Sequence, residues 1–200
     1  MRSARGNSGA AATIAAAISF FIASAAPAAD DIPRKAEACS ACHGPAGNST
    51  DPGMPSLAGQ PAQFVATQLY FYREGSRKDP QMTPFAAPLT DTEMADLAAW
   101  YASQKPVLPP RVPLTASQAQ AGRALAEQYF CLACHGTALE GREYAPRLSA
   151  LHLDYLTSQL RRFKAGTRGD LDGAMTTAAQ PLTEATIVEL ARFIAGMPAP

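Results

Sequence analysis

The sequence Cys39-Ser40-Ala41-Cys42-His43 occurs a second time, with one residue changed, as Cys131-Leu132-Ala133-Cys134-His135. A Cys-x-x-Cys-His run is the attachment signature of c-type haem. The two thiols bond to the vinyl groups of the haem, and the histidine is placed under the iron. The repeated pattern therefore predicts two covalently bound haem c groups.

All four cysteines of the chain lie in these two runs, so no cysteine is left for a separate disulfide. Two other interpretations of paired cysteines stay open. The four thiolates could share one structural zinc ion, which favours such pairs as ligands, or each pair could form a redox-active dithiol. Neither explains why a histidine follows the second cysteine in both runs, so haem attachment is the interpretation that we favour.

The two runs belong to a repeat that extends along most of the chain. Cys39 and Cys131 are 92 residues apart, and Gln68-Leu69 recurs as Gln159-Leu160 after 91. A repeat of this length is a whole small domain. Four prolines between the copies disfavour a helix and predict a semi-rigid linker. We expect an all-α chain with a first domain at 29–102, a Pro-rich linker at 103–114 and a second domain at 115–200.

Charge and motif content narrow the class of function. The formal net charge of the 200 residues is zero, so the chain lacks the basic surface that is typical of nucleic-acid-binding proteins. The sequence also has no Gly-rich nucleotide-binding loop and no Ser-His-Asp arrangement. We expect no nucleic-acid partner, and the pattern favours an electron carrier over an enzyme.

The segment 1–28 has the layout of a secretory signal peptide. Arg2 and Arg5 precede an uncharged run rich in alanine, and Ala26-Pro27-Ala28 offers a small-x-small cleavage site. The alternative is an uncleaved membrane anchor, since the uncharged stretch approaches the length of a bilayer span. We expect cleavage and export to the periplasm, where peripheral association with the membrane is possible.

Each copy contains two further predicted helices. The first covers residues 61–74 in one copy and 151–165 in the other, and a glycine follows each. The last helix opens in the first copy with the capping box Thr90-Asp91-Thr92-Glu93. Both last helices carry an apolar stripe at helical spacing that should face a core. The stripes are Met94, Leu97, Ala98 and Tyr101, and Ile187, Leu190, Ala191 and Ile194.

The helix before each haem motif is predicted to differ between the copies. In the first copy Asp30 to Ala38 contains Pro33, so we expect a short or frayed helix. In the second copy Ser117 is the expected cap of a longer helix that runs to Gln128.

A haem iron held by one histidine has an open sixth position, and the group that fills it decides between ligand chemistry and electron transfer. Met82 follows His43 at almost the same interval at which Met175 follows His135, and each methionine precedes a threonine. Thioether sulfur is a soft ligand that favours ferrous iron. We predict these two methionines as the sixth ligands. Met54 is a rival in the first copy, but the second copy has no methionine at the corresponding place.

Each proximal histidine needs an acceptor for its second ring N–H. Pro55 follows His43, and Pro146 follows His135, at intervals that differ by a single position. A proline carbonyl can accept this bond, although each proline could instead be a plain turn residue.

Arg77 and Arg168 lie a few residues before the two methionines. Because arginine binds carboxylates in a bidentate manner, these side chains could pair with haem propionates. The alternative is that they are solvated. His152 is expected to be a surface or capping residue and not a ligand.

A series of short motifs follows along the first copy: Cys39-x-x-Cys42-His43-Gly44, Gly47-Asn48-Ser49, Pro55-x-Leu57-Ala58-Gly59-Gln60, Gln68-Leu69, Gly75-x-Arg77, Met82-Thr83 and Leu89-Thr90. Together they resemble the first domain of the di-haem cytochrome c4 family, and the second copy is similar to the second domain. The Asn-Ser and Gly-Gln features are missing from the second copy.

The resemblance implies two tandem class I cytochrome c domains in a pseudo-two-fold arrangement, with the haems facing one another across the interface. It implies thioether attachment at Cys39, Cys42, Cys131 and Cys134. It also implies axial ligation by His43, Met82, His135 and Met175.

The favoured function is that of a periplasmic di-haem electron carrier of a respiratory chain. The donor would be a quinol-oxidising complex or a dehydrogenase, and the resemblance implies a terminal oxidase as acceptor. A second possibility is the di-haem cytochrome subunit of a periplasmic dehydrogenase, such as flavocytochrome c sulfide dehydrogenase. A third is a di-haem enzyme, such as a peroxidase or a thiosulfate oxidoreductase, in which one haem keeps an open or unusual sixth position.

Overall fold

The computed structural model describes Met1 and residues 31–197. The predicted signal peptide, apart from Met1, lies outside these residues. The first unit contains α1 (Asp31–His43), the 3₁₀ helix η1 (Pro45–Gly47), α2 (Ala62–Arg73), α3 (Thr83–Ala86) and α4 (Asp91–Ser103). The second contains α5 (Ala116–Gln128), α6 (Cys131–His135), α7 (Leu153–Lys164), α8 (Ala174–Ala179) and α9 (Glu184–Gly196). Within the described part of the chain the only β pairing is one isolated bridge.

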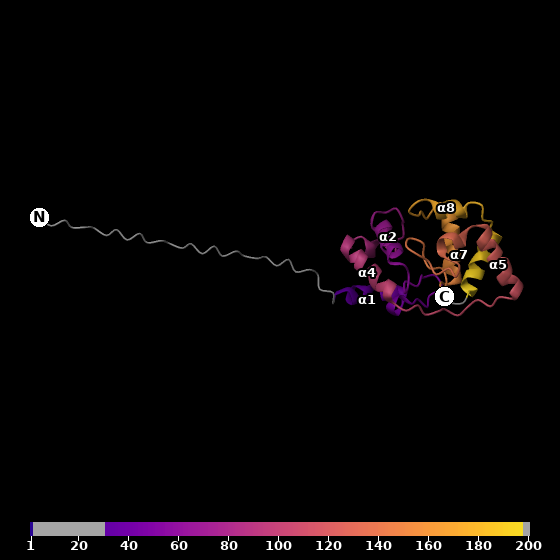
Figure 1. The fold of residues 1–200 in the computed structure, drawn as a ribbon, viewed down its shortest axis with the longest axis horizontal. Helices are drawn as coiled ribbons and strands as arrows, with labels where there is room; N and C mark the ends of the chain where they lie inside the picture. The colour runs from indigo at the N-terminus through magenta and orange to yellow at the C-terminus, as the bar shows by residue number, and fades with distance from the viewer. Residues whose placement is uncertain (2–30, 198–200) are drawn as a thin grey trace.

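The two units lie side by side, and each is built around its last helix. In the first unit α1 and α2 pack against α4, and in the second unit α5 and α7 pack against α9. Figure 1 shows α1, α2 and α4 grouped on one side of the molecule and α5, α7 and α8 on the other. The same three-helix arrangement therefore occurs twice.

The predicted apolar stripes of the last helices are buried. All eight of the stripe residues on α4 and α9 have at most 4% of their surface exposed. The capping box at the start of α4 is also present, because Thr90 accepts from the N–H of Glu93 while the Glu93 carboxylate accepts from the N–H of Thr90. Periodicity and capping chemistry were sufficient to predict this part of the fold.

The helix before the second haem motif begins earlier than predicted. Its N-cap is Thr115, whose hydroxyl accepts from the N–H of Gln118, and the Gln118 side chain accepts from the N–H of Thr115. The prediction of Ser117 as the cap was wrong because the Thr-x-x-Gln pair forms a complete capping box. Ser117 lies inside the first turn of α5.

The helix before the first haem motif is not frayed. α1 runs from Asp31 to His43 without a break, so the haem motif forms its last turns. Pro33 lies in the first turn, where the missing N–H removes no helical hydrogen bond. The break occurs in the second unit instead, where Phe130 has a φ of 57° between α5 and α6 and is 78% exposed.

The first and last helices of the second unit approach closely at a glycine. A Cβ atom placed on Gly122 of α5 would lie 2.3 Å from the Cβ of Phe193 on α9. Any larger residue at this position would push the two helices apart, because protein interiors leave no room for such an overlap. Gly122 therefore fixes the distance between α5 and α9.

The linker between the units is bound to both of them. Residues 104–114 form no helix or strand. At one end, the Asn48 side chain donates to the carbonyl of Lys105 at 3.2 Å and accepts from the N–H of Val107 at 2.7 Å. At the other end, the N–H of Val112 donates to a carbonyl of α9. The extended linker thus runs along the edge of both units, as Figure 1 shows.

None of the helices within the described residues is long and apolar enough to cross a membrane.

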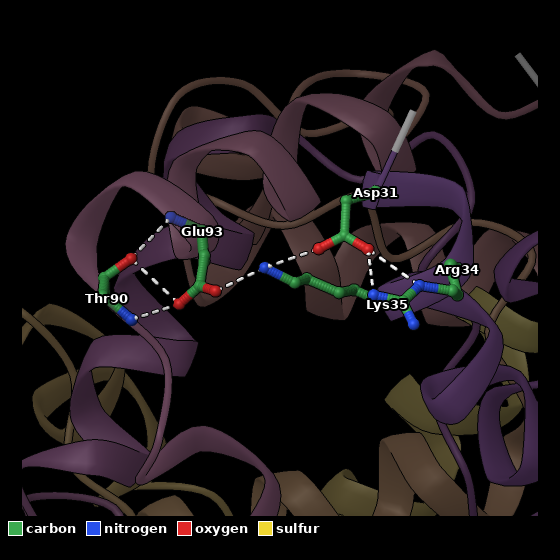
Figure 2. A network of polar contacts seen from close by, with 5 residues as sticks. All are labelled: Asp31, Arg34, Lys35, Thr90 and Glu93. Carbon is green, nitrogen blue, oxygen red and sulfur yellow. Dashed lines mark hydrogen bonds and ion pairs between the residues drawn. The ribbon is translucent and has the colours of Figure 1, made fainter. Parts of the chain in front are cut away.

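An ion-pair network joins the start of α1 to the start of α4, as Figure 2 shows. Lys35 lies between two carboxylates, 3.1 Å from Asp31 and 2.5 Å from Glu93. The ammonium group of Lys35, followed by the N–H and hydroxyl of Thr90, lowers the pKa of Glu93 from its usual 4.5 to about 2. The network therefore fastens the helix that carries the first haem motif to the core helix of its unit.

We expect the stabilisation from Glu93 to depend on pH. Because its pKa is lower in the folded chain, the stabilisation is complete above pH 4.5 and is lost as the pH falls through about 2. Glu93→Gln keeps the capping box but removes the charge. The midpoint of thermal unfolding should therefore fall less steeply in this variant than in the wild type between these pH values. Asp96→Asn removes an equal charge from the same helix and should follow the wild type; parallel curves for all three proteins would contradict the prediction.

Candidate haem sites and the interface between them

One mostly apolar cavity of about 710 Å³ lies between the two units. Its wall contains the histidines of both Cys-x-x-Cys-His motifs and both of the methionines predicted as sixth ligands. These four residues are His43, Met82, His135 and Met175. Residues that are far apart in the chain are thus collected around one space, which is continuous across the interface.

Both motif histidines are oriented by a proline carbonyl. Nδ1 of His43 lies 2.9 Å from the carbonyl oxygen of Pro55, and Nδ1 of His135 lies 2.8 Å from that of Pro146. A carbonyl can only accept, so each Nδ1 carries the proton and each Nε2 has a free lone pair. Burial lowers the pKa of both imidazoles, which favours the neutral form that binds a metal.

The Nε2 atom of His43 is buried and has no hydrogen-bond partner. Such an orphaned atom is costly unless it binds something else. Because His43 is oriented through its other nitrogen and lines the cavity, Nε2 is available as an axial ligand of iron. The residues present therefore fit a haem group in this cavity.

The cysteines fit covalent attachment better than the two alternatives. A zinc ion shared by the four cysteines would require their side chains to lie close together. Among the described residues, no three side chains of His, Cys, Asp or Glu lie close enough to form such a site. Reactive Cys-x-x-Cys dithiols have a thiol with a lowered pKa. Here burial raises the pKa of both Cys39 and Cys131.

The segments that carry the two methionines are organised by aspartates that the sequence analysis missed. The Asp79 carboxylate accepts from the N–H of Met82 at 3.1 Å, and the Asp170 carboxylate accepts from the N–H of Met175 at 2.5 Å. The signal was present as a repeated Gly-x-Arg-x-Asp pattern, since both Asp79 and Asp170 follow the predicted arginines by two residues. Met54, the rival ligand, also lines the cavity.

Arg77 and Arg168 are brought together at the interface and are not solvated; only 4% and 5% of their surfaces are exposed. Arg77 donates to Gln68 of its own unit at 2.6 Å and to Gln159 of the other unit at 3.2 Å. Arg168 repeats this pattern, with 2.5 Å to Gln159 and 3.3 Å to Gln68. The four side chains therefore form a crossed cluster with pseudo-two-fold symmetry.

The Arg77–Arg168 cluster also lies against the cavity. Both arginines line it, and the Nε atom of each is buried without a partner. Two cations at this wall, each with an unused donor, fit a nearby carboxylate group. This is where the propionates of two bound haems would be expected.

Another buried contact joins the two units close to His135, the proximal histidine of the second unit. The side-chain amide of Gln60 donates to the carbonyl of Arg147 at 2.9 Å and accepts from its N–H at 3.0 Å. Arg147 directly follows Pro146, the residue that orients His135. Gln60 belongs to one of the short motifs of the first copy, but its role is not visible in the sequence because its partner lies in the other copy.

His152 also contacts the other unit. Its Nε2 atom lies 2.9 Å from the carbonyl oxygen of Ser49, and its backbone is the N-cap of α7. The predicted position at the helix cap is confirmed, but the side chain makes no capping hydrogen bond and is half-buried, so it is not a surface group. Its side chain adds a contact between the units that the sequence does not reveal.

Comparisons with known proteins agree with two haem domains. The family model described as cytochrome c oxidase, cbb3-type, subunit III matches residues 33–100, and the model described as cytochrome c matches residues 119–198. Over 167 residues the chain is 39% identical to cytochrome c4 of Thiocapsa roseopersicina, which covers 80% of this chain and 86% of the relative. The chain belongs to the cytochrome c4 family.

Two further similarities support membership of the cytochrome c4 family. The crystal structure of reduced recombinant cytochrome c4 from Pseudomonas stutzeri matches with a TM-score of 0.76 at 30% identity, covering 86% of this chain and 100% of the other. A thiosulfate dehydrogenase electron acceptor of Thiomonas intermedia is 35% identical over 177 residues, covering 83% of this chain and 81% of the relative. The predicted all-α fold with two tandem cytochrome c domains is confirmed.

Membership of the cytochrome c4 family also establishes the cofactors and the broad activity. The protein carries two covalently bound haem c groups and is an electron carrier. Each haem iron, when bound, gains or loses one electron. The protein supplies the attachment sites, the apolar surroundings and the polar contacts that orient each histidine.

Proposed function

We propose that the protein is a periplasmic di-haem cytochrome that shuttles electrons between respiratory redox partners, with a terminal oxidase as the final acceptor. We infer a signal peptide at 1–28, haem domains at 29–102 and 115–200, and a linker at 103–114. Each domain would hold one low-spin iron with histidine and methionine ligands. Such irons have no open coordination position, which suits transfer of electrons without substrate chemistry.

The observation that carries this proposal is the single cavity that both units share. His43 and Met82 line it from one unit, and His135 and Met175 line it from the other. Two haems held by these residues would lie in one mostly apolar space. This supports exchange of electrons between the haems inside one molecule. Thioether attachment is assigned to Cys39, Cys42, Cys131 and Cys134, orientation of the histidines to Pro55 and Pro146, and pairing with propionates to Arg77 and Arg168.

A redox titration of the purified holoprotein, followed by visible absorption, tests this proposal. We expect two one-electron waves, low-spin spectra in both oxidation states and no binding of carbon monoxide to the reduced protein. The reduced protein should also be oxidised by membranes that contain a terminal oxidase. A high-spin haem that binds carbon monoxide would contradict the carrier function.

A periplasmic dehydrogenase is a candidate electron donor. The relative from Thiomonas intermedia is named a thiosulfate dehydrogenase electron acceptor, and this favours a dehydrogenase as electron donor. Two dehydrogenases can be compared as donors, a thiosulfate dehydrogenase and a flavoprotein sulfide dehydrogenase. Stopped-flow mixing of the oxidised cytochrome with each reduced enzyme in parallel measures which one reduces the haems faster. Stable co-purification with a flavin subunit would instead favour a fixed subunit over a mobile carrier.

A further inference from the structure

The two loops that carry the proposed methionine ligands are built alike but are held differently. In the second unit, the Asp170 carboxylate that binds the N–H of Met175 also accepts from the hydroxyl of Thr176, at 2.8 Å. The Met175 loop is therefore stabilised by Asp170, a residue of the same loop. Gln68 of the first unit accepts from Arg168, two residues before Asp170, but among the described residues no side chain of the first unit forms a hydrogen bond or ion pair with Asp170 itself.

In the first unit, the corresponding loop is held from the other domain. Arg162 of α7 places one guanidinium nitrogen 3.6 Å from the Asp79 carboxylate, and the other donates to the carbonyl of Lys78 at 3.1 Å. Asp79 in turn accepts from the N–H of Gln81 and of Met82. A continuous set of contacts thus runs from a helix of the second unit to the backbone of Met82.

The reverse contact cannot form. The position that corresponds to Arg162 in the first copy, in the register that pairs Gln159-Leu160 with Gln68-Leu69, is Phe71, which has no charge to offer Asp170. The asymmetry therefore depends on a single pair of corresponding residues, Arg162 and Phe71, within an otherwise repeated pattern. This difference between the copies has a structural effect because the domains dock with α7 beside the loop that contains Lys78 and Asp79.

We propose that Arg162 is a positioning residue that holds the Met82 loop from the second domain, so that this contact steadies the sixth ligand of the first haem and not that of the second. The inference rests on the proposed role of Met82 as an iron ligand. A planar guanidinium that engages a carboxylate and a carbonyl together restricts the loop more than a single charge does. Loss of the Arg162 contact loosens Met82 and leaves Met175 in place.

The effect should be moderate. The side chains of Arg162 and Asp79 are 29% and 21% exposed, so solvent screens part of the attraction. We expect Arg162→Gln to accelerate displacement of the methionine by an external ligand by about threefold to tenfold at the first haem, with no change at the second. Arg162→Lys, which keeps the charge but loses the two-point contact, should fall between the wild type and Arg162→Gln.

The test measures cyanide binding to the full-length ferric holoprotein. The two haems are distinguished by the hyperfine-shifted methionine methyl resonances of the same ferric protein, assigned with Met82→Ala and Met175→Ala. Arg161→Gln is the matched control, since Arg161 is the adjacent residue on α7 but pairs with Glu184 of its own unit. This control should bind cyanide at wild-type rates at both haems. In an Asp79→Asn background, Arg162→Gln should have less than half of its effect, because the ion pair is already lost.

Three outcomes would overturn the inference. They are equal acceleration at both haems, no acceleration in Arg162→Gln, and the same acceleration in Arg161→Gln. Failure of the ligand assignment looks different, since Met82→Ala would then retain the methionine signal of the first haem. The two failures are therefore separable in one set of proteins.

Discussion

Replacing Met82 with alanine should remove the sixth ligand of the first haem. We expect loss of about half of the ferric methionine-to-iron charge-transfer absorption near the red edge of the visible spectrum. The reduced variant should bind about one carbon monoxide molecule per protein, because one iron is open and the other remains closed. Met175→Ala should give the same result at the second haem, and the double variant should lose the whole band.

The rival ligand provides the control for this experiment. Met54 lines the same cavity as Met82, so its distance from the haem site alone does not exclude it. It lacks the carboxylate that anchors the backbone of Met82. Met54→Ala should therefore keep the full charge-transfer band and bind no carbon monoxide. A full band in Met82→Ala together with loss of about half of the band in Met54→Ala would reverse the assignment.

A Gly122→Val variant should destabilise the second domain strongly. The new side chain would begin 2.3 Å from Phe193, an overlap that α5 and α9 can relieve only by moving apart. Overpacking of this kind costs about 1–3 kcal/mol, which exceeds the few tenths of a kcal/mol gained in helix propensity when valine replaces glycine. We expect a lower midpoint of thermal unfolding, measured on the holoprotein by circular dichroism.

The matched control replaces the residue next to this glycine. Ala121 is exposed on the same helix, so Ala121→Val places the same branched side chain on α5 without the contact with Phe193 and costs only a few tenths of a kcal/mol in helix propensity. Its unfolding midpoint should lie close to that of the wild type. Equal destabilisation by the two variants would mean that a branched side chain anywhere on this turn of α5, and not the distance between α5 and α9, determines the effect.

The local chemistry of the chain was predictable because it depends on neighbours in sequence. Thr90 and Glu93 form their capping box within one turn, and the stripe around Leu97 follows from helical periodicity. The approximate end of α2 followed in the same way, since Gly75 adopts a φ of 74° directly after the C-cap. Where the prediction failed, a better local partner existed: Thr115 pairs with Gln118, which leaves no capping role for Ser117.

From motif spacing alone, the candidate sites were predictable only as separate halves. The spacing of each motif indicated His43 with Pro55 and His135 with Pro146, and both pairs lie within hydrogen-bonding distance. Nothing in the spacing indicated that the two halves share one cavity. Contacts between residues of different copies, such as Gln60 with Arg147, are set by how the domains dock.

By itself, the sequence determined that the chain has two haem-attachment motifs, two copies of one helical unit and a proline-rich linker. These features follow from covalent chemistry, helical periodicity and backbone restriction, which act over short distances. Only the tertiary structure decided that Arg77 and Arg168 face each other and that Arg162 reaches the loop of Met82. The reason is physical: a repeated sequence specifies the same surface twice, but the few residues that differ between the copies acquire a role only when the two surfaces meet.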